Sequence, residues 1–155
     1  LDAVFDSCQL ALPQLQSTIN SGKASGASIV NVASLDAVRG DRGFAAYNAA
    51  KAGVANFTRS LALEFGPEGI RSNTVSPGAV DTPLTTMTTS NPTAAAAFES
   101  AIPLGRFGAP HEVAAAIAFL AADEASFING ANLLVDGGVT AGTGHPDVLA
   151  LFDMQ

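Results

Sequence analysis

The sequence predicts an α/β fold in which helices cover both faces of a mostly parallel β-sheet. Short β-branched segments alternate with longer helix-like segments, and the strand candidates end at serine, proline or glycine turns. Strands joined through long helices favour right-handed parallel connections. With 155 residues, 48% of them hydrophobic, the chain can bury one sizeable core. We therefore expect a single domain over residues 1–155, with a tail at residues 139–155.

The first elements along the chain are a helix and a strand. Apolar side chains in residues 2–15 recur at spacings of three and four, as on one face of a helix. The single cysteine, Cys8, falls on that face, which predicts a small buried side chain and no internal disulfide. A polar loop at 17–27 separates this helix from a β-branched strand candidate at 28–33, and Ser34 lies at the end of that strand.

A long helix and a second strand come next. Residues 45–65 keep their apolar side chains in helical phase until the Gly-Pro pair at 66–67 ends the helix. Residues 70–75 predict a second buried strand, which the Pro-Gly pair at 77–78 stops.

The last part of the chain predicts a loop, two helices and a strand. Residues 82–101 are polar and interrupted by proline before becoming alanine-rich, which predicts a mobile loop and then a short helix. Residues 110–122 form a further helix candidate with proline near its first turn. The last strand, at 133–135, ends at the Gly-Gly pair at 137–138. Ligands of parallel sheets gather beyond the carboxyl ends of the strands, so the segments that follow the three strand candidates are the first places to look for a site.

Charge and composition exclude several classes of partner. Fourteen acidic residues oppose seven basic ones, and the basic residues form no stripe, so we expect no nucleic-acid partner. The strongly apolar run at 113–122 is too short to cross a bilayer, and no basic and apolar leader pattern begins the sequence, so we expect a cytoplasmic protein. His111 and His145 have no second ligand at metal spacing, so we expect no metal site.

Three polar residues suggest proton chemistry. Tyr47 and Lys51 are four apart in a helical segment, so their side chains project from the same face one turn apart. An ammonium beside a phenol favours the ionised phenol, so such a pair can exchange a proton near neutral pH. Ser34, at a strand end, can donate a hydrogen bond to the same substrate oxygen. The Tyr-x-x-x-Lys spacing alone is more typical of a packed tyrosine beside a surface lysine.

Five segments in a fixed order give that spacing its context. They are residues 29–34 (IVNVAS), 47–53 (YNAAKAG), 73–82 (NTVSPGAVDT), 103–108 (PLGRFG) and 129–138 (NGANLLVDGG). In sequence and spacing these segments resemble the short-chain dehydrogenase/reductase family, and the resemblance extends over essentially the whole chain as far as Gly138. It implies a Rossmann-like, doubly wound parallel sheet with three α/β/α layers, whose catalytic part this chain represents.

The resemblance also implies a site. Tyr47 matches the family's general acid/base, and Ser34 matches the residue that orients the substrate carbonyl or alcohol. Lys51 matches the residue that binds the nicotinamide ribose and favours the ionised phenol. The segment that lies along the nicotinamide corresponds to Pro77, Gly78, Val80 and Thr82. Together they imply an NAD(P)-dependent oxidoreductase that interconverts an alcohol and a ketone by hydride transfer; the choice between NAD and NADP stays open.

The substrate side of the site is less specific. By analogy with the family, the lining residues are Leu35, Asp36, Phe44, Ala79 and part of the segment 82–98. These permit a polyol, a sugar, a keto-ester or a small hydroxy compound. The resemblance further implies a homotetramer, and whether the tail after Gly138 reaches a neighbouring subunit's pocket stays open.

The chain departs from the family pattern in lacking a glycine-rich phosphate loop near its first residue. We expect the amino-terminal part of the fold, including the family's catalytic asparagine, to precede Leu1. The glycines at 138–144 imitate the spacing of that loop, but too few residues follow them for a helix and a strand, which favours a flexible tail. Two alternatives remain: a non-catalytic remnant that packs against a partner, and a lyase or epimerase of the same fold.

Overall fold

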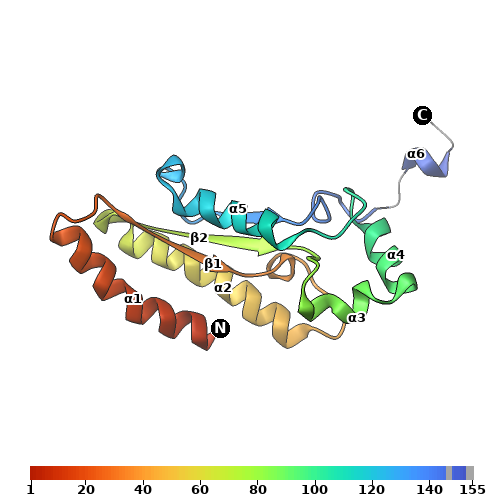
Figure 1. Cartoon of the computed structure of the whole chain (residues 1–155), viewed down its shortest axis with the longest axis horizontal. Coiled ribbons are helices and arrows are strands. Elements are labelled where there is room, and N and C mark those ends of the chain that lie inside the picture. Colours follow the sequence, from red (N-terminus) through yellow and green to blue (C-terminus); the bar gives the residue numbers. More distant parts are fainter. Residues whose placement is uncertain (146–147, 153–155) are drawn as a thin grey trace.

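The computed structural model describes residues 1–145 and 148–152, and it places the main elements in three layers (Figure 1). Parallel strands β1 (Ala27–Val32), β2 (Ile70–Pro77) and β3 (Asn132–Val135) form one sheet in that order. Helices α1 (Asp2–Asn20) and α2 (Ala45–Phe65) cover one face, and α5 (Pro110–Ala121) covers the other. The predicted doubly wound parallel sheet is confirmed.

Shorter elements surround the ends of this sheet. Near the carboxyl ends of the strands lie η1 (Leu35–Ala37), η3 (Pro83–Thr85), α3 (Thr86–Thr89) and α4 (Pro92–Ala101). The turns η2 (Gly66–Glu68) and η4 (Asp123–Ala125) follow α2 and α5, and α6 (Val148–Leu151) lies near the end of the chain.

The strand register brings three strand ends together at one edge of the sheet. Val32 of β1 pairs with Val75 of β2, and Pro77 of β2 pairs with Val135 of β3. The ladder continues past the strands, because the Ala33 amide donates to the Val75 carbonyl at 2.8 Å and the Gly78 amide donates to the Val135 carbonyl at 3.0 Å. The segments that begin at Ser34, Gly78 and Asp136 therefore start next to one another.

Two apolar clusters hold the helices on the sheet. One joins Cys8 and Leu12 of α1 to Leu61 of α2 and Ile70 of β2. The other joins β2 to α5 and η4 through Val75, Leu120 and Ala125. Cys8 is a buried hydrophobic side chain, as predicted; its burial raises the pKa of the thiol, and the contact with the Asn31 side chain opposes that effect only in part.

The central strand also carries buried polar side chains that position the last strand. Asn73 is fully buried; its amide nitrogen donates to the Ile128 carbonyl at 2.8 Å, and its oxygen accepts from the Ala131 amide at 2.9 Å. Asn129 accepts from the Ser72 amide and donates to the Ala62 carbonyl. These bonds fix the loop that leads into β3, and hence the place where Asp136 emerges.

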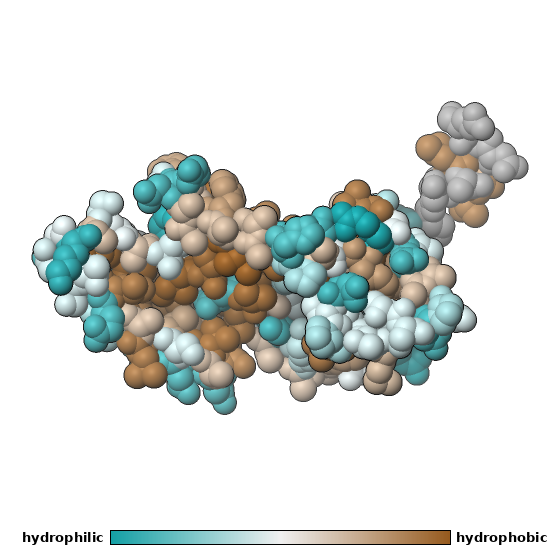
Figure 2. All heavy atoms as spheres, viewed as in Figure 1, coloured by the Kyte–Doolittle hydropathy of each residue, from teal (hydrophilic) through white to brown (hydrophobic). Residues whose placement is uncertain are grey.

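The outer edge of β1 has no strand partner within residues 1–145 and 148–152. Figure 2 shows apolar surface along this edge, between α1 and α5. Val32, the last residue of β1, is exposed. An exposed parallel edge with apolar surroundings is suited to pairing with a further strand.

The structure corrects several predicted boundaries. Helix α1 runs to Asn20, so the loop predicted from residue 17 is wrong at its start: Ile19 still packs on the core cluster and prolongs the helix. Strands β1, β2 and β3 are shifted or extended by one or two residues. Residues 83–89 are helical, contrary to the predicted irregular loop, because Thr82 and Thr85 form a reciprocal cap that starts the helical turns.

The tail prediction concerns residues 139–155, of which 146–147 and 153–155 lie outside the described residues. Thr140 lies in a turn held by hydrogen bonds from its amide and hydroxyl to the Asp136 carboxylate. The first residues of the tail thus adopt a defined conformation on this chain. The single domain over residues 1–155 stays a prediction.

Replacement of Asn73 with alanine is expected to destabilise the fold. The change leaves the Ile128 carbonyl and the Ala131 amide without their partner, and we expect it to lower the free energy of unfolding by about 3 kcal/mol. Denaturant unfolding of the intact protein measures this. The control Asn56→Ala, at an exposed position of α2, should change it by no more than about 0.5 kcal/mol. Equal effects of the two substitutions would contradict the role given to Asn73.

Candidate active site

Ser34 is placed by the end of β1 and the start of η1. Ser34 is buried, and its backbone is extended. It caps η1, because its hydroxyl oxygen accepts a hydrogen bond from the Asp36 amide at 3.2 Å. The hydroxyl also lies 3.3 Å from the Asp36 carboxylate, a long contact. The oxygen is thus held in place, while its proton can turn to an acceptor that lies closer.

Tyr47 and Lys51 are placed by the docking of α2 on the sheet. Thr58, fully buried in α2, accepts a hydrogen bond from the Asn31 side chain of β1 at 3.0 Å, which ties the helix to the strand. One end of α2 then reaches the carboxyl edge of the sheet. There the Lys51 ammonium donates to the Val32 carbonyl at 3.2 Å and lies 5.7 Å from the centre of the Tyr47 ring. The predicted one-turn pairing of phenol and ammonium is present.

A pocket of about 390 Å³, here called the strand-end pocket, opens at this edge. It contains six of the predicted site residues: Ser34, Tyr47, Pro77, Gly78, Val80 and Thr82. Its remaining walls come from the end of β1, from η3 and from the start of α5: Val32, Ala33, Leu84, Thr85, Pro110 and Val113. Tyr47 and Ser34 therefore line one cavity.

A second and larger pocket, of about 600 Å³, lies on the other side of Ser34. It is here called the tail-side pocket, because Val139, Gly142 and Gly144 line it. Four of the predicted substrate-side residues belong to it: Ser34, Leu35, Asp36 and Ala79. The two pockets share Ser34, Gly78 and Thr85, so they meet at the candidate catalytic serine.

Two predicted residues lie outside both pockets. Phe44, expected on the substrate side, instead packs edge-on against Tyr47, with ring centres 6.3 Å apart. Lys51 lines neither cavity, and its described contacts are with the Val32 carbonyl and the Tyr47 ring.

Gly78 has a spatial role where the pockets meet. A Cβ atom at this position would lie 2.8 Å from both the Cα and the Cβ of Asp136, closer than side chains tolerate. Its absence lets the chain leaving β2 pass directly against the chain leaving β3. Beyond it, the Val80 amide makes no hydrogen bond within the described residues, although its carbonyl accepts from the Thr85 hydroxyl. The Val80 amide is thus a backbone donor without a described partner in the lining of the strand-end pocket.

Several lining residues were missed by sequence reasoning. Arg39, Asp41, Ile102 and Phe107 line the tail-side pocket, whereas Thr85, which lines both pockets, belongs to the segment 82–98 that was expected on the substrate side. Phe107 stacks on Phe98 at a centroid distance of 5.8 Å, which brings the loop before α5 against α4. The only available signal was that Asp41 and Arg39 follow a strand end. The packing of α4 on this edge has no such signal.

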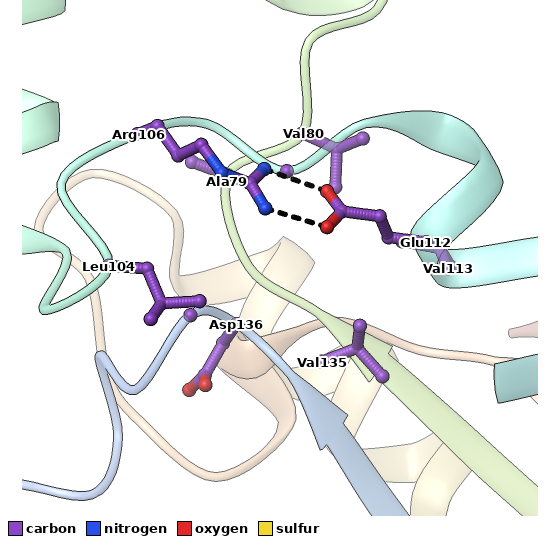
Figure 3. A pocket seen from close by; sticks show the side chains of 10 residues that line it. Ala79, Val80, Leu104, Arg106, Glu112, Val113, Val135 and Asp136 are labelled. Atoms are coloured by element: carbon purple, nitrogen blue, oxygen red, sulfur yellow. Dashed lines mark hydrogen bonds and ion pairs between the residues drawn. The ribbon is translucent and has the colours of Figure 1, made fainter. Parts of the chain in front are cut away.

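A smaller cavity, of about 100 Å³, lies behind the strand ends (Figure 3). Glu112 of α5 binds both terminal nitrogens of Arg106, at 2.7 and 2.8 Å, and also accepts from the Ala109 amide. The Arg106 guanidinium and the Ala109 amide lower the pKa of Glu112 from 4.5 to about 2. This carboxylate fixes the loop that pairs with Val80 through Gly108.

Asp136 points into the turn that begins the tail. Its carboxylate accepts from the amides of Gly138 and Thr140, both at 2.9 Å, and from the Thr140 hydroxyl. Burial alone would raise the pKa of Asp136, but these hydrogen bonds hold it below its ordinary value. The carboxylate is therefore charged at neutral pH and stabilises the turn.

The described part of the chain contains neither a metal-binding cluster nor a membrane-spanning helix. Within residues 1–145 and 148–152, no three His, Cys, Asp or Glu side chains are grouped as a metal would require. Over the same residues, none of the helices combines the length and apolar character needed to span a bilayer.

Comparison with known proteins adds a family. A family model described as enoyl-(acyl carrier protein) reductase matches residues 1–140. Meso-2,3-butanediol dehydrogenase of Serratia marcescens is 45% identical over 96% of this chain and 56% of its own length. Cis-4-hydroxycyclohexanecarboxylate dehydrogenase of Sinomonas cyclohexanicum is 51% identical over 78% of this chain and 47% of its own length.

A solved structure of a similar protein has the same fold. The crystal structure of a putative 2-deoxy-D-gluconate 3-dehydrogenase from Agrobacterium tumefaciens with bound NADP superposes with a TM-score of 0.84 at 34% identity, over 92% of this chain and 56% of that protein. This chain thus spans about half the length of the proteins it resembles.

Replacement of Glu112 with glutamine should lower thermal stability in a pH-dependent way. The folded-state pKa of Glu112 lies below its ordinary value, so its stabilising effect is complete above pH 4.5 and is lost as the pH falls toward about 2. The difference in melting temperature between wild type and Glu112→Gln should therefore be constant near neutral pH and shrink below pH 4.5.

Melting curves of the intact protein, recorded from pH 7 down to the lowest pH at which the protein stays folded, measure this difference. Glu64→Gln, at an exposed position of α2, serves as the control and should show little difference at any pH. A Glu112→Gln difference that grows as the pH falls would contradict the assignment.

Proposed function

Because the chain belongs to the short-chain dehydrogenase/reductase family, we propose that it carries the catalytic site of an NAD(P)-dependent oxidoreductase that interconverts a secondary alcohol and a ketone. The observation that carries this proposal is that Tyr47 and Ser34 line one pocket, while Ser34 also lines a second. Two cavities that meet at a hydroxyl suit a reaction between two bound molecules.

The strand-end pocket fits a nicotinamide. It offers the unpaired Val80 amide and the Thr82 hydroxyl for the carboxamide, and the small Gly78 where the ring would lie closest to the backbone. The bound dinucleotide would supply or accept the hydride. Residues 77–82 would orient the nicotinamide, and Lys51 would bind its ribose hydroxyls.

The tail-side pocket would hold the alcohol or ketone with its oxygen toward Ser34. In the direction of reduction, the Ser34 hydroxyl donates a hydrogen bond to the carbonyl oxygen, and Tyr47 gives its phenolic proton to the same oxygen. In the direction of oxidation, Tyr47 receives that proton. The long contact between Ser34 and Asp36 would give way, since a substrate oxygen is the better-placed acceptor.

Lys51 has donors left for this task. One hydrogen bond to the Val32 carbonyl fixes the ammonium beside the Tyr47 ring, and an ammonium group has three protons to donate. The remaining protons suit the ribose hydroxyls of a bound cofactor.

The substrate class follows from the walls of the tail-side pocket. Apolar side chains, including Leu35, Phe98 and Ile102, share these walls with polar groups near Ser34. We infer a small secondary alcohol with an apolar body. Two similar enzymes are named for meso-2,3-butanediol and for cis-4-hydroxycyclohexanecarboxylate, both small hydroxy compounds, which agrees with this size.

We also propose a cytoplasmic homotetramer. Leu10 of α1 and Leu63 of α2 are highly exposed on one side of the chain, and Phe119 and Phe127 are exposed near α5. Two separate apolar surfaces are what a molecule with two kinds of interface needs. The one cysteine is a buried free thiol, in keeping with a reducing compartment.

Replacement of Tyr47 with phenylalanine should abolish turnover and leave binding intact. The change removes the proton donor and little volume, so we expect kcat for meso-2,3-butanediol or cyclohexanol to fall at least about 100-fold. Steady-state kinetics of the intact protein measure this. Circular dichroism and the Kd for reduced nicotinamide cofactor are the controls. Near-normal kcat in a folded, cofactor-binding variant would overturn the mechanism.

Replacement of Lys51 with methionine should weaken cofactor binding. Loss of charged hydrogen bonds predicts a rise of about tenfold or more in the Kd for NADH or NADPH, measured by fluorescence titration. The other lysine of the chain, Lys23, lies in the exposed loop after α1, and Lys23→Met is the matched control. Wild-type protein that binds neither cofactor would instead favour a non-catalytic packing module.

A further inference from the structure

Arg39 joins two segments that lie far apart in the sequence. It follows η1, and its Nη2 atom donates to the carbonyl oxygens of Thr140 at 3.1 Å and Gly142 at 2.7 Å. These partners lie 101 and 103 residues further along the chain. Arg39 therefore fastens the start of the tail, residues 139–144, to the loop that leaves β1. These residues are here called the tail segment.

The tail segment has a second anchor. The Asp136 carboxylate accepts hydrogen bonds from the amide and the hydroxyl of Thr140, while Arg39 binds the Thr140 carbonyl. Thr140 is thus held from β3 on one side and from the loop after β1 on the other. Such a two-sided attachment fixes a short irregular segment that contains two glycines, at 142 and 144.

The fastened segment is a wall of the tail-side pocket. Val139, Gly142 and Gly144 line this cavity together with Arg39 itself. The same pocket contains Phe98 and Ile102 of the α4 region, and Figure 1 shows the chain after β3 passing toward α4. The tail segment therefore lines a pocket of its own chain, the one that also contains Ser34.

The charges around Arg39 argue against a role in binding an anionic substrate. Asp36 and Asp41 line the same pocket, so its described lining holds two carboxylates and one guanidinium. That balance does not favour an anionic substrate. Arg39 also makes no ion pair with either aspartate within residues 1–145 and 148–152; its described hydrogen bonds go to the tail segment.

We propose that Arg39 is a specificity-determining residue, which positions the tail segment as the wall against which the far end of a larger alcohol packs. The proposal rests on the proposed function. A compact substrate such as meso-2,3-butanediol would occupy the region near Ser34, whereas the ring of cyclohexanol extends farther into the cavity. Loss of the Arg39 hydrogen bonds to the tail segment should then weaken binding of the ring alcohol and not of the diol.

The test compares Arg39→Met with wild type in the intact protein. Methionine keeps an unbranched apolar stem and removes the donors. For Arg39→Met we expect the KM of cyclohexanol to rise about tenfold at nearly unchanged kcat, and kcat/KM for meso-2,3-butanediol to change by less than about twofold. Arg42→Met is the matched control, because Arg42 is exposed in the same loop and lines neither pocket.

Amide hydrogen exchange of residues 139–145 gives a readout independent of activity. Exchange at Thr140 and Ala141, whose amides are bonded within the turn, should become faster in Arg39→Met and not in Arg42→Met. Unchanged exchange, or faster exchange with equal kinetic effects on the two alcohols, would overturn the proposal for Arg39. A wild-type protein that oxidises neither alcohol would overturn the proposed function and the specificity role with it.

Discussion

The parallel register of the three strands is the constraint on which the candidate site depends. Because Val32 pairs with Val75 and Pro77 pairs with Val135, the three chain segments that leave the sheet start side by side. Each segment then supplies a different part of the site: Ser34 after β1, the backbone of residues 78–82 after β2, and the tail anchor Asp136 after β3. A slip of one residue in either pair would turn these groups to the opposite face of the sheet.

The central strand maintains this register with polar contacts as well as apolar ones. Asn73 of β2 binds the loop that leads into β3, and Asn129 of that loop binds Ser72 of β2 in return. The small side chains of Ser72 and Thr74 lie on the same face of β2 as Ile70, which packs against α1 and α2. Close packing of α2 on that face, together with the Asn31 to Thr58 hydrogen bond, brings one end of α2 to the site. The position of Tyr47 thus depends on side chains farther from the carboxyl edge of the sheet, among them Asn31 and Thr58.

The sequence predicted the sheet and its parallel sense, because these follow from short-range periodicity, whereas the set of site residues came from the family resemblance of the motifs. Ser34, Tyr47, Pro77, Gly78, Val80 and Thr82 line one cavity in the structure. The placement of Phe44, the helical turns at 83–89 and the contact of Arg39 with the tail could not be predicted in this way. Each depends on a contact between segments whose relative position is set only when the sheet has formed, and Arg39 with Gly142, 103 residues away, is the extreme case.

We propose that a nicotinamide and an alcohol meet at Ser34 between the two pockets. A crystal structure of the intact protein with NADH or NADPH and cyclohexanone tests this proposal. We expect the nicotinamide ring to lie against residues 77–80, and the ketone oxygen to lie within hydrogen-bonding distance of both the Ser34 and the Tyr47 hydroxyls. A ketone bound with its oxygen away from both hydroxyls, or a nicotinamide bound outside the strand-end pocket, would contradict it.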